Sequence, residues 1–214
     1  MRDALLALHF QNDICHRDGL IPFSLDRSTS AAANFFSAGK RALDEARRAG
    51  WTIAHIHIAF APDYSDLLRN CRLFLKTETL GALKRGSWGA APYAGFEPTA
   101  GEIVVTTNCN SGFRRTGLEA ALTEQGVGRV NVMGLATQFS VEHTVRDAAD
   151  IAAVRRLLRL GRHGGAWRNA AHDASTGGRD REPRGVVGLA EPNEQNREGQ
   201  GCSRTDCCAA GAFW

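Results

Sequence analysis

The stretch RVNVMGLATQFSVEHTVRDAAD, residues 129–150, passes from an apolar run into a segment with apolar residues at helical spacing. Its first part, RVNVMG, predicts a short strand, and its last part, SVEHTVRDAAD, predicts a helix. Directly upstream, TGLEAALTEQG, residues 116–126, predicts another helix that ends at Gly126, because glycine is common just past a helix. A helix, a strand and a second helix in close succession are typical of an α/β sheet.

The same alternation extends toward the N-terminus. ALLALHF, residues 4–10, is a short continuous apolar run, as expected for a strand that is covered on both faces. WTIAHIHIAF, residues 51–60, and GEIVVTT, residues 101–107, predict two more strands, and residues 28–49 have the apolar spacing of a helix. The pattern predicts one α/β domain over residues 1–150, with a mainly parallel sheet and helices on both faces.

Composition sets limits on the class of protein. The chain has 214 residues, enough for one α/β domain with a full core, and 43% of them are hydrophobic and 23% charged. A net charge of +3 is too small to indicate a nucleic-acid or membrane partner. No apolar run approaches the roughly 20 residues of a membrane span, and the start MRDALLALHF has an acidic residue and no small-residue cleavage site. We therefore expect a cytoplasmic protein.

The six cysteines divide between the first part of the chain and its end: Cys15, Cys71 and Cys109, and then Cys202, Cys207 and Cys208. None of them forms a repeated CxxC pair, so the sequence supports neither a zinc site nor a disulfide framework. We expect free thiols in a reducing compartment.

Residues 151–214 differ in character from the rest. They hold 10 glycines and 10 arginines but no lysine, and only AAVRRLL and GVVGLA have a structured pattern, so no strand beyond the fourth is predicted. One interpretation is a poorly ordered basic extension. The other, which we favour, is a shifted reading frame, because one-nucleotide-shifted codons of residues 154–156 can spell Tyr-Asp-Val and those of residues 161–162 can spell Asp-Ala. If the tail is genuine, we expect the sheet to lack its last strands and to expose an apolar edge.

Two stretches carry a family resemblance: LLALHFQND, residues 5–13, and the segment from Asn110 to Asp150. They resemble the isochorismatase-like cysteine hydrolases, whose first strand ends in Asp-x-Gln-Asn-Asp and whose fourth strand runs into Gly-x-Ala-Thr-x-x-Cys-Val-x-x-Thr-x-Arg-Asp-Ala. The resemblance covers residues 4–150 and implies a Rossmann-like, doubly wound fold. It also implies a hydrolase that acts on a small amide or ether, without a cofactor, in a homo-oligomer.

The family's catalytic triad is replaced at every position. In the family, an Asp that ends the first strand is the general base, a Lys after the third strand assists, and a Cys at the start of the helix after the fourth strand is the nucleophile. The matching positions here are His9, Thr107 and Ser140, and no lysine follows Lys84. The surrounding scaffold does match the family, at Gln11, Asn12, Asp13, Phe113, Thr116, Gly134, Ala136, Thr137, Val141, Thr144, Arg146, Asp147 and Ala148.

The resemblance also implies a substrate-binding frame. In the family, the peptide before the motif alanine is cis, and the amides of that alanine and of the nucleophile form the oxyanion hole. Here these would be the Leu135–Ala136 peptide and the amides of Ala136 and Ser140, with Gln11 as a further binding residue. A non-proline cis bond costs about 3 kcal/mol, so the surroundings must enforce it.

Several interpretations of these residues remain open. His9 and Ser140 form a Ser/His pair if they lie within about 3 Å; otherwise His9 is a hydrogen-bonded residue of a decayed pocket. His55 and His57 alternate on a strand and face the same side, which makes them weak metal candidates or simply two strand histidines, one of them buried. The function is correspondingly either an isochorismatase-like hydrolase with a degenerate triad or a non-catalytic relative that binds a small molecule or a partner subunit.

Overall fold

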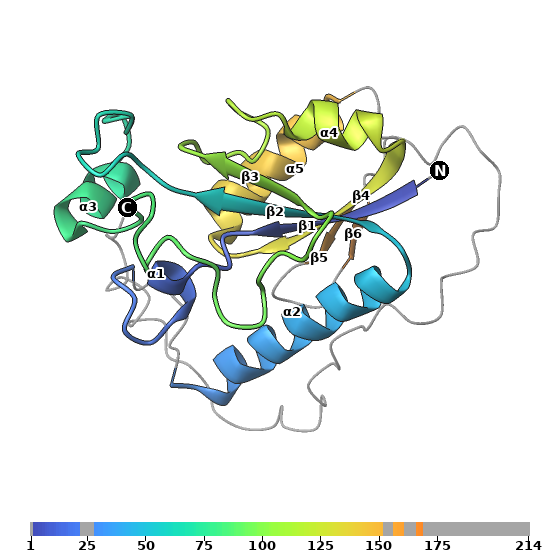
Figure 1. Cartoon of the computed structure of the whole chain (residues 1–214), viewed down its shortest axis with the longest axis horizontal. Coiled ribbons are helices and arrows are strands. Elements are labelled where there is room, and N and C mark those ends of the chain that lie inside the picture. Colours follow the sequence, from blue (N-terminus) through green and yellow to red (C-terminus); the bar gives the residue numbers. More distant parts are fainter. Residues whose placement is uncertain (1, 22–27, 152–155, 161–165, 169–214) are drawn as a thin grey trace, which may run out of the picture.

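The computed structural model describes residues 2–21, 28–151, 156–160 and 166–168. A single sheet runs through it in the order β3-β2-β1-β4-β5-β6 (Figure 1). The strands are β1 (Arg2–Leu8), β2 (Thr52–Ile58), β3 (Ile103–Thr107), β4 (Val127–Gly134), β5 (Arg156–Leu160) and β6 (Ala166–Arg168). The first five strands pair in parallel, and only β6 runs antiparallel to its neighbour.

Strand β1 occupies the centre of the sheet. It pairs with β2 on one side, where Ala4 lies opposite Thr52, and with β4 on the other, where Ala4 lies opposite Val130. The chain therefore winds outward from β1 to β3, then returns and winds outward from β4 in the other direction. The crevice beyond the carboxyl ends of β1 and β4 is the topological switch point, where doubly wound proteins bind ligands.

Helices cover both faces of the sheet. The helices are α1 (Asn12–Cys15), α2 (Ser30–Arg48), α3 (Arg72–Leu80), α4 (Leu118–Glu124) and α5 (Glu142–Ala149), and a π-helix, η1 (Thr137–Val141), leads directly into α5. Figure 1 shows α2 on one side of the sheet and α4 with α5 on the other, while α3 lies beyond the carboxyl ends of the strands. This arrangement confirms the predicted doubly wound α/β architecture.

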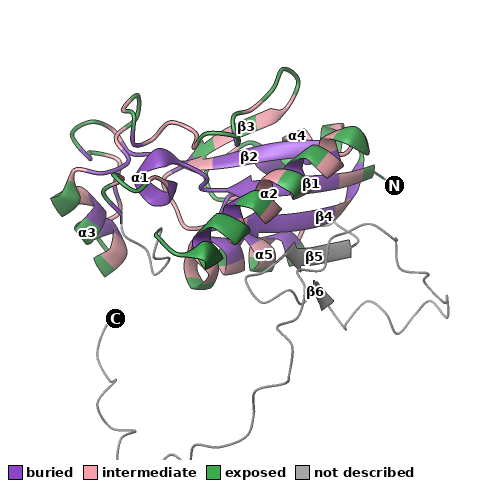
Figure 2. Ribbon diagram, turned by 90° about the horizontal axis from the view of Figure 1, so that it is seen from below, coloured by how far each residue is buried: buried purple, intermediate pink, exposed green. Residues whose placement is uncertain are grey.

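Alternation along β1 explains the two cores. Leu5 and Ala7 belong to the cluster that includes the buried side chains of α2, such as Leu43. Leu6 and Leu8 point the other way and belong to the cluster with Leu118 and Leu122 of α4. Because β1 is covered on both faces, nearly all of it is buried (Figure 2). Each fully buried leucine contributes roughly 1.5–3 kcal/mol of transfer free energy.

The sequence patterns locate most elements to within a few residues. The helix predicted over residues 28–49 is α2, and its start is capped by the Thr29 hydroxyl, which accepts a hydrogen bond from the Ala32 amide at 3.3 Å. The helix predicted over 116–126 is α4, and the last predicted helix becomes η1 followed by α5. Helix α3 was not predicted.

The structure corrects the prediction that no strand follows the fourth. Strand β5 lies partly within the AAVRRLL segment and pairs in parallel with β4, so the edge of β4 that we expected to be exposed is covered. GVVGLA and the rest of residues 169–214 lie outside the described residues. The frameshift therefore stays a prediction, and resequencing the codons for residues 146–167 tests it.

None of the helices in the described part of the chain combines the length and the apolar character needed to cross a bilayer.

Candidate functional site

The three triad positions all lie at the carboxyl ends of strands. His9 directly follows β1, Thr107 is the last residue of β3, and Ser140 lies in η1 after β4. Each of the three side chains is buried, between 1% and 3% exposed. The sequence therefore places the family's site at the correct edge of the sheet. What the residues do there depends on their contacts.

His9 is held by its backbone and not by its side chain. Its φ of 61° is left-handed, and its amide donates to the carbonyl of Ile56 at 2.8 Å, which continues the β1–β2 pairing. Neither ring nitrogen has a hydrogen-bond partner among the described residues, so no hydrogen bond joins the imidazole to Ser140. The predicted Ser/His pair is not assembled in this structure, and the imidazole also lacks the hydrogen bonds that the decayed-pocket interpretation gave it.

Burial also changes the basicity of His9. Desolvation, together with the nearby His57, lowers the pKa of His9 to about 3. A general base works best when its pKa lies near the operating pH. His9 is therefore neutral and weakly basic near pH 7, and it does not replace the family's carboxylate.

Thr107 has a structural role in the loop that follows β3. Its hydroxyl accepts a hydrogen bond from the Cys109 amide at 3.0 Å. The same oxygen lies 3.2 Å from the carbonyl oxygens of both Ser111 and Arg114, so its proton is donated into that loop. Where the family has a flexible cation, this chain has a buried hydroxyl that fixes the course of the loop.

Replacing Thr107 by valine is expected to lower the free energy of unfolding by about 1–3 kcal/mol, because the change keeps the shape but leaves buried loop groups without their partner. Urea denaturation measures the loss. Thr106, the exposed neighbour in β3, supplies the control, since Thr106→Val should change stability by less than about 0.5 kcal/mol. Equal effects of the two variants would show that the Thr107 hydroxyl bonds contribute nothing.

The structure corrects the prediction for the Leu135–Ala136 peptide, because none of the described peptide bonds is cis. The chain instead turns at Ala136, whose φ is 57°. Two residues earlier, close packing requires glycine, because a Cβ on Gly134 would lie 2.6 Å from the Cβ and carbonyl oxygen of Leu8. The oxyanion hole formed by the amides of Ala136 and Ser140 stays a prediction.

Ser140 lies in an irregular helical turn. It belongs to η1, in which the Val141 amide donates to the Ala136 carbonyl at 3.4 Å, five residues back. π-Helical turns occur often at functional sites. Ser140 is buried, and no hydrogen bond joins its hydroxyl to the imidazole of His9.

Gln11 and Asn12 attach a distant loop to the end of β1. The Gln11 amide donates to the carbonyls of Ile58 at 2.9 Å and Ala90 at 2.8 Å, and accepts from the Ile58 amide at 2.8 Å. Asn12 donates to the carbonyl of Trp88 at 2.9 Å. These bonds occupy the side chain that we expected to bind substrate, so Gln11 positions the loop instead.

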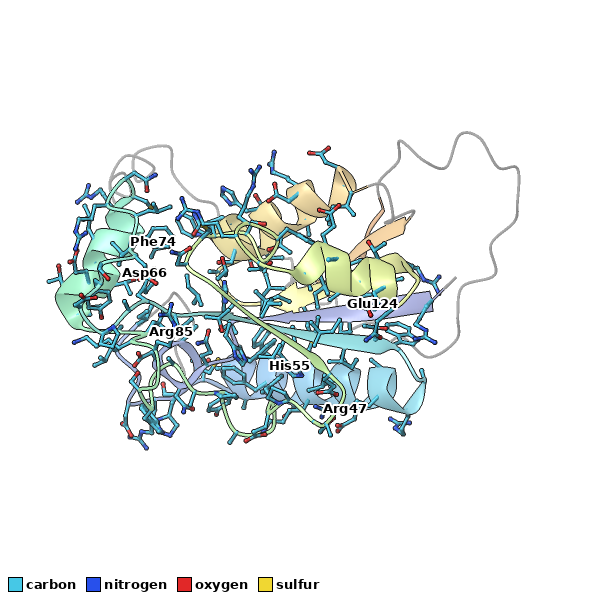
Figure 3. All side chains as sticks on the ribbon, turned by 45° about the horizontal axis from the view of Figure 1, so that its top comes forward. Arg47, His55, Asp66, Phe74, Arg85 and Glu124 are labelled. Carbon is cyan, nitrogen blue, oxygen red and sulfur yellow. The ribbon has the colours of Figure 1, made fainter. Side chains whose placement is uncertain are left out.

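The two weak metal candidates lie together on β2, as predicted, with ring centroids 6.3 Å apart. His55 is buried, and its Nε2 lies 2.9 Å from the Glu102 carboxylate. Because a carboxylate only accepts, Nε2 carries a hydrogen and donates a hydrogen bond to Glu102. Burial by itself would raise the pKa of Glu102, but hydrogen bonds from Arg47, Thr99 and His55 outweigh it and hold the pKa at about 2. Figure 3 labels two of these partners, Arg47 on α2 and His55 on β2. No cluster of three or more potential metal ligands exists in the described ranges.

A cavity of about 330 Å³ opens among the segments that follow β2, β3 and β4. Its wall comes from three segments: the approach to and first turn of α3 (Leu68, Asn70, Cys71 and Phe74), the loop after β3 (Cys109, Asn110, Ser111 and Arg114), and α5 (His143 and Asp147). His9, Thr107 and Ser140 are not part of this wall. The reachable chemical groups at this edge are therefore different from the ones that the family motif predicts.

The family relationship follows from the sequence match. A family model described as the isochorismatase domain matches residues 3–151, more than half of the chain. The chain belongs to the isochorismatase family. This confirms the resemblance drawn from LLALHFQND and from the motif after β4.

Two relatives of this isochorismatase-family chain are named ureidoacrylate amidohydrolase RutB. The one from Yersinia enterocolitica is 29% identical over 158 residues, 67% of each chain, and the one from Agrobacterium fabrum is 26% identical over 162 residues, 68% of each chain. In two further relatives of the same name, the matched part spans 63% and 62% of their length.

Solved structures show the same fold. N-carbamoylsarcosine amidase from Thermoplasma acidophilum matches with a TM-score of 0.59 at 22% identity, over 80% of this chain and 87% of that one. A cysteine hydrolase from Pseudomonas syringae matches with a TM-score of 0.62 at 21% identity, over 78% and 72%. An isochorismatase family protein from Desulfovibrio vulgaris matches with a TM-score of 0.60 at 26% identity, over 74% and 78%.

Sequence reasoning did not identify the residues of the cavity wall. Cys71 and Cys109 had been interpreted only as free thiols, and His143 as part of a helix. One signal was available: Cys109 lies two residues past Thr107, in the loop that carries the family's lysine position. Cys71 and His143 carried no comparable signal, since only the fold brings them to the same cavity.

Proposed function

We propose that this isochorismatase-family chain is a hydrolase of small amide or ether substrates in which the family's triad is degenerate. The observation that carries the proposal is the cavity of about 330 Å³ at the carboxyl edge of the sheet, next to the retained motif after β4. Its volume lies at the low end of small-molecule sites, and its wall comes from segments that follow β2, β3 and β4 in the chain.

The cavity chemistry favours an amide over an ether. Asn110, in the cavity wall, has a side-chain oxygen without a hydrogen-bond partner among the described residues; because this atom is buried, a ligand N–H group reaches it only if the side chain turns. Arg114 bonds Asp147 at 3.1 Å, which leaves other guanidinium donors for a carbonyl or carboxylate. Relatives named for ureidoacrylate hydrolysis agree with this pattern. We therefore propose a small carboxamide or ureido acid as the substrate.

The second candidate function is binding without catalysis. It is favoured by the state of His9, which is buried and weakly basic, and by Thr107, whose hydroxyl is committed to its loop. A protein of this kind would hold a small molecule or a partner subunit in the same cavity. We also propose that the chain forms a homo-oligomer, which light scattering on the purified protein tests directly.

One assay separates the two functions. The purified full chain is incubated with simple carboxamides, N-carbamoyl amino acids and ureido acids, and ammonia release is compared with that of heat-denatured protein. Release above the control supports the hydrolase. Thermal stabilisation by the same compounds without release supports binding alone, and the absence of both effects contradicts the proposed function.

Restoring the family residues provides a further prediction. The triple variant His9→Asp, Thr107→Lys and Ser140→Cys is expected to release ammonia at least about 100-fold faster than the natural chain, since acid–base groups contribute roughly 10²–10⁴ in rate. Circular dichroism checks that the variant is folded. A folded triple variant without activity would show that the pocket has diverged beyond the triad.

A further inference from the structure

Strand β3 forms one edge of the sheet. It is the last strand in the sheet order, so β2 pairs with one side of it and none of the described strands pairs with the other (Figure 2). Its register with β2 runs without a shift from Ile103 to Thr107. A regular edge strand of this kind presents a row of unpaired backbone N–H and C=O groups, to which a further strand can bind.

The backbone groups on the open side belong to Val104 and Thr106. The Thr107 carbonyl accepts a hydrogen bond from the Ala59 amide at 3.1 Å, so Thr107 faces β2. The N–H and C=O of one strand residue point to the same side, and this side alternates along the strand. Val105 therefore faces β2 as well, whereas Val104 and Thr106 face outward. Outside the regular ladders, no backbone hydrogen bond between described residues involves either of them.

The edge lacks the charges, prolines and bulges with which proteins usually prevent edge pairing. Its sequence, IVVTT, consists of β-branched residues, and no charged residue lies between Glu102 and Arg114. Glu102 itself is bonded to Arg47 at 2.7 Å, and its side chain is only 9% exposed. The outward residues are open to solvent, because Val104 is 49% exposed and Thr106 is exposed as well.

The pattern of outward groups is complementary to itself. If a two-fold axis passes beside Val105, Val104 of one copy lies opposite Thr106 of a second copy, and antiparallel residues paired in this way exchange two hydrogen bonds. The axis repeats the pair, so all the outward N–H and C=O groups of Val104 and Thr106 find partners in both copies. Because the strand is uncharged, the pairing brings no like charges together.

We propose that the outer edge of β3 is a homodimer interface, at which two copies of the chain join their sheets by antiparallel β3–β3 pairing. The inference rests on the homo-oligomer of the proposed function and deepens it, because it names the surface. A stable interface buries roughly 800 Å² on each partner, and a strand of five residues supplies only part of that area. We therefore expect a dimer that dissociates on dilution.

Val104→Pro tests the interface in the full chain. An edge strand accepts proline where the N–H faces away from the sheet, so the pairing of β3 with β2 stays intact. The change removes one hydrogen bond from each of the two pairs, and sedimentation velocity should show a dissociation constant at least about tenfold higher. The control Val104→Thr keeps the N–H and the branched shape, and should change the constant by less than about threefold. Circular dichroism checks that both variants are folded.

Hydrogen exchange of the natural chain gives a second measurement that needs no variant. The amides of Val104 and Thr106 are paired only in the proposed dimer, so we expect them to exchange more slowly as the protein concentration rises. The amide of Val105, which faces β2 in monomer and dimer alike, is the internal control. Its exchange rate should not depend on concentration.

Three outcomes would overturn the interface. A chain that is monomeric at every concentration contradicts the homo-oligomer as well. An oligomer with the same dissociation constant in the natural chain and in Val104→Pro leaves the homo-oligomer standing, with its interface elsewhere. Slow exchange of the Val104 and Thr106 amides at every concentration would show that the chain covers its own edge. The ammonia assay of the natural chain reports on hydrolysis independently of all three.

Discussion

Replacing His9 by asparagine is expected to make the protein markedly less sensitive to acid. Burial lowers the pKa of His9 to about 3 in the folded state, whereas in the unfolded chain it is close to 6.5. At a pH between these two pKa values, His9 is protonated in the unfolded chain and neutral in the folded protein. The free energy of unfolding therefore falls as the pH falls. A fully realised difference of one proton amounts to about 1.4 kcal/mol for each pH unit.

Asparagine suits the position because it tolerates the left-handed backbone, for which φ is 61° at His9. Urea denaturation at pH 7.5, 6 and 5 measures the slope of stability against pH. His57, with its pKa lowered to about 4 by burial, keeps part of the slope, so the double variant His9→Asn and His57→Asn should be flatter still. Identical slopes for the natural chain and the His9 variant would show that His9 is protonated without cost in the folded state.

Gln11→Ala is expected to lower the free energy of unfolding by about 3–5 kcal/mol. The substitution removes three hydrogen bonds of 2.8–2.9 Å, two of them buried and one partly buried, and leaves both polar groups of the Ile58 backbone without their side-chain partner. A net hydrogen bond contributes about 1 kcal/mol, and each buried group left unsatisfied costs about 1–3 kcal/mol. Gln11 is fully buried, so water does not reach these groups in the folded state.

The matched control for Gln11 is Gln138→Ala, at an exposed glutamine in η1. Its effect should remain within about 0.5 kcal/mol, because exposed substitutions away from special contacts have little effect on stability. Urea denaturation of both variants gives the comparison. A loss below about 1 kcal/mol for Gln11→Ala would mean that the loop around Ala90 rearranges and supplies new partners.

The fold could be predicted because its signals are local. The continuous apolar run of β1 follows from burial on both faces, and the helical spacing of α2 follows from burial on one. Helix α3 lacked such a signal, and the structured pattern of AAVRRLL, which overlaps β5, was too short to assign as a strand. Strand β5 is only five residues long, and pairing with β4 stabilises it. Helix α3 lies outside the sheet, so it is not part of the alternation of strands and helices from which the other elements were predicted.

The positions of the three triad residues at one edge of the sheet could be predicted, whereas their contacts could not. The motif located His9, Thr107 and Ser140 at one edge of the sheet, and all three are there. Their burial could not be predicted, because it depends on side chains from distant segments. The same reason explains why the shared cavity of Cys109 and His143, which are 34 positions apart, was not predicted. The close approach of Gly134 to Leu8 likewise joins two stretches that are far apart in the sequence.

The central position of β1 also has a consequence during synthesis. Asp3 at its start bonds Arg129 of β4 at 2.9 Å, across 126 positions of sequence. At about 5–20 residues per second, the ribosome makes β4 on the order of ten seconds after β1. During that interval β1 can pair with β2, but the other edge of β1, which pairs with β4 in the folded protein, is unpaired and apolar. We therefore expect the nascent chain to depend on chaperones in this interval and to be most prone to aggregate before residue 134 is made.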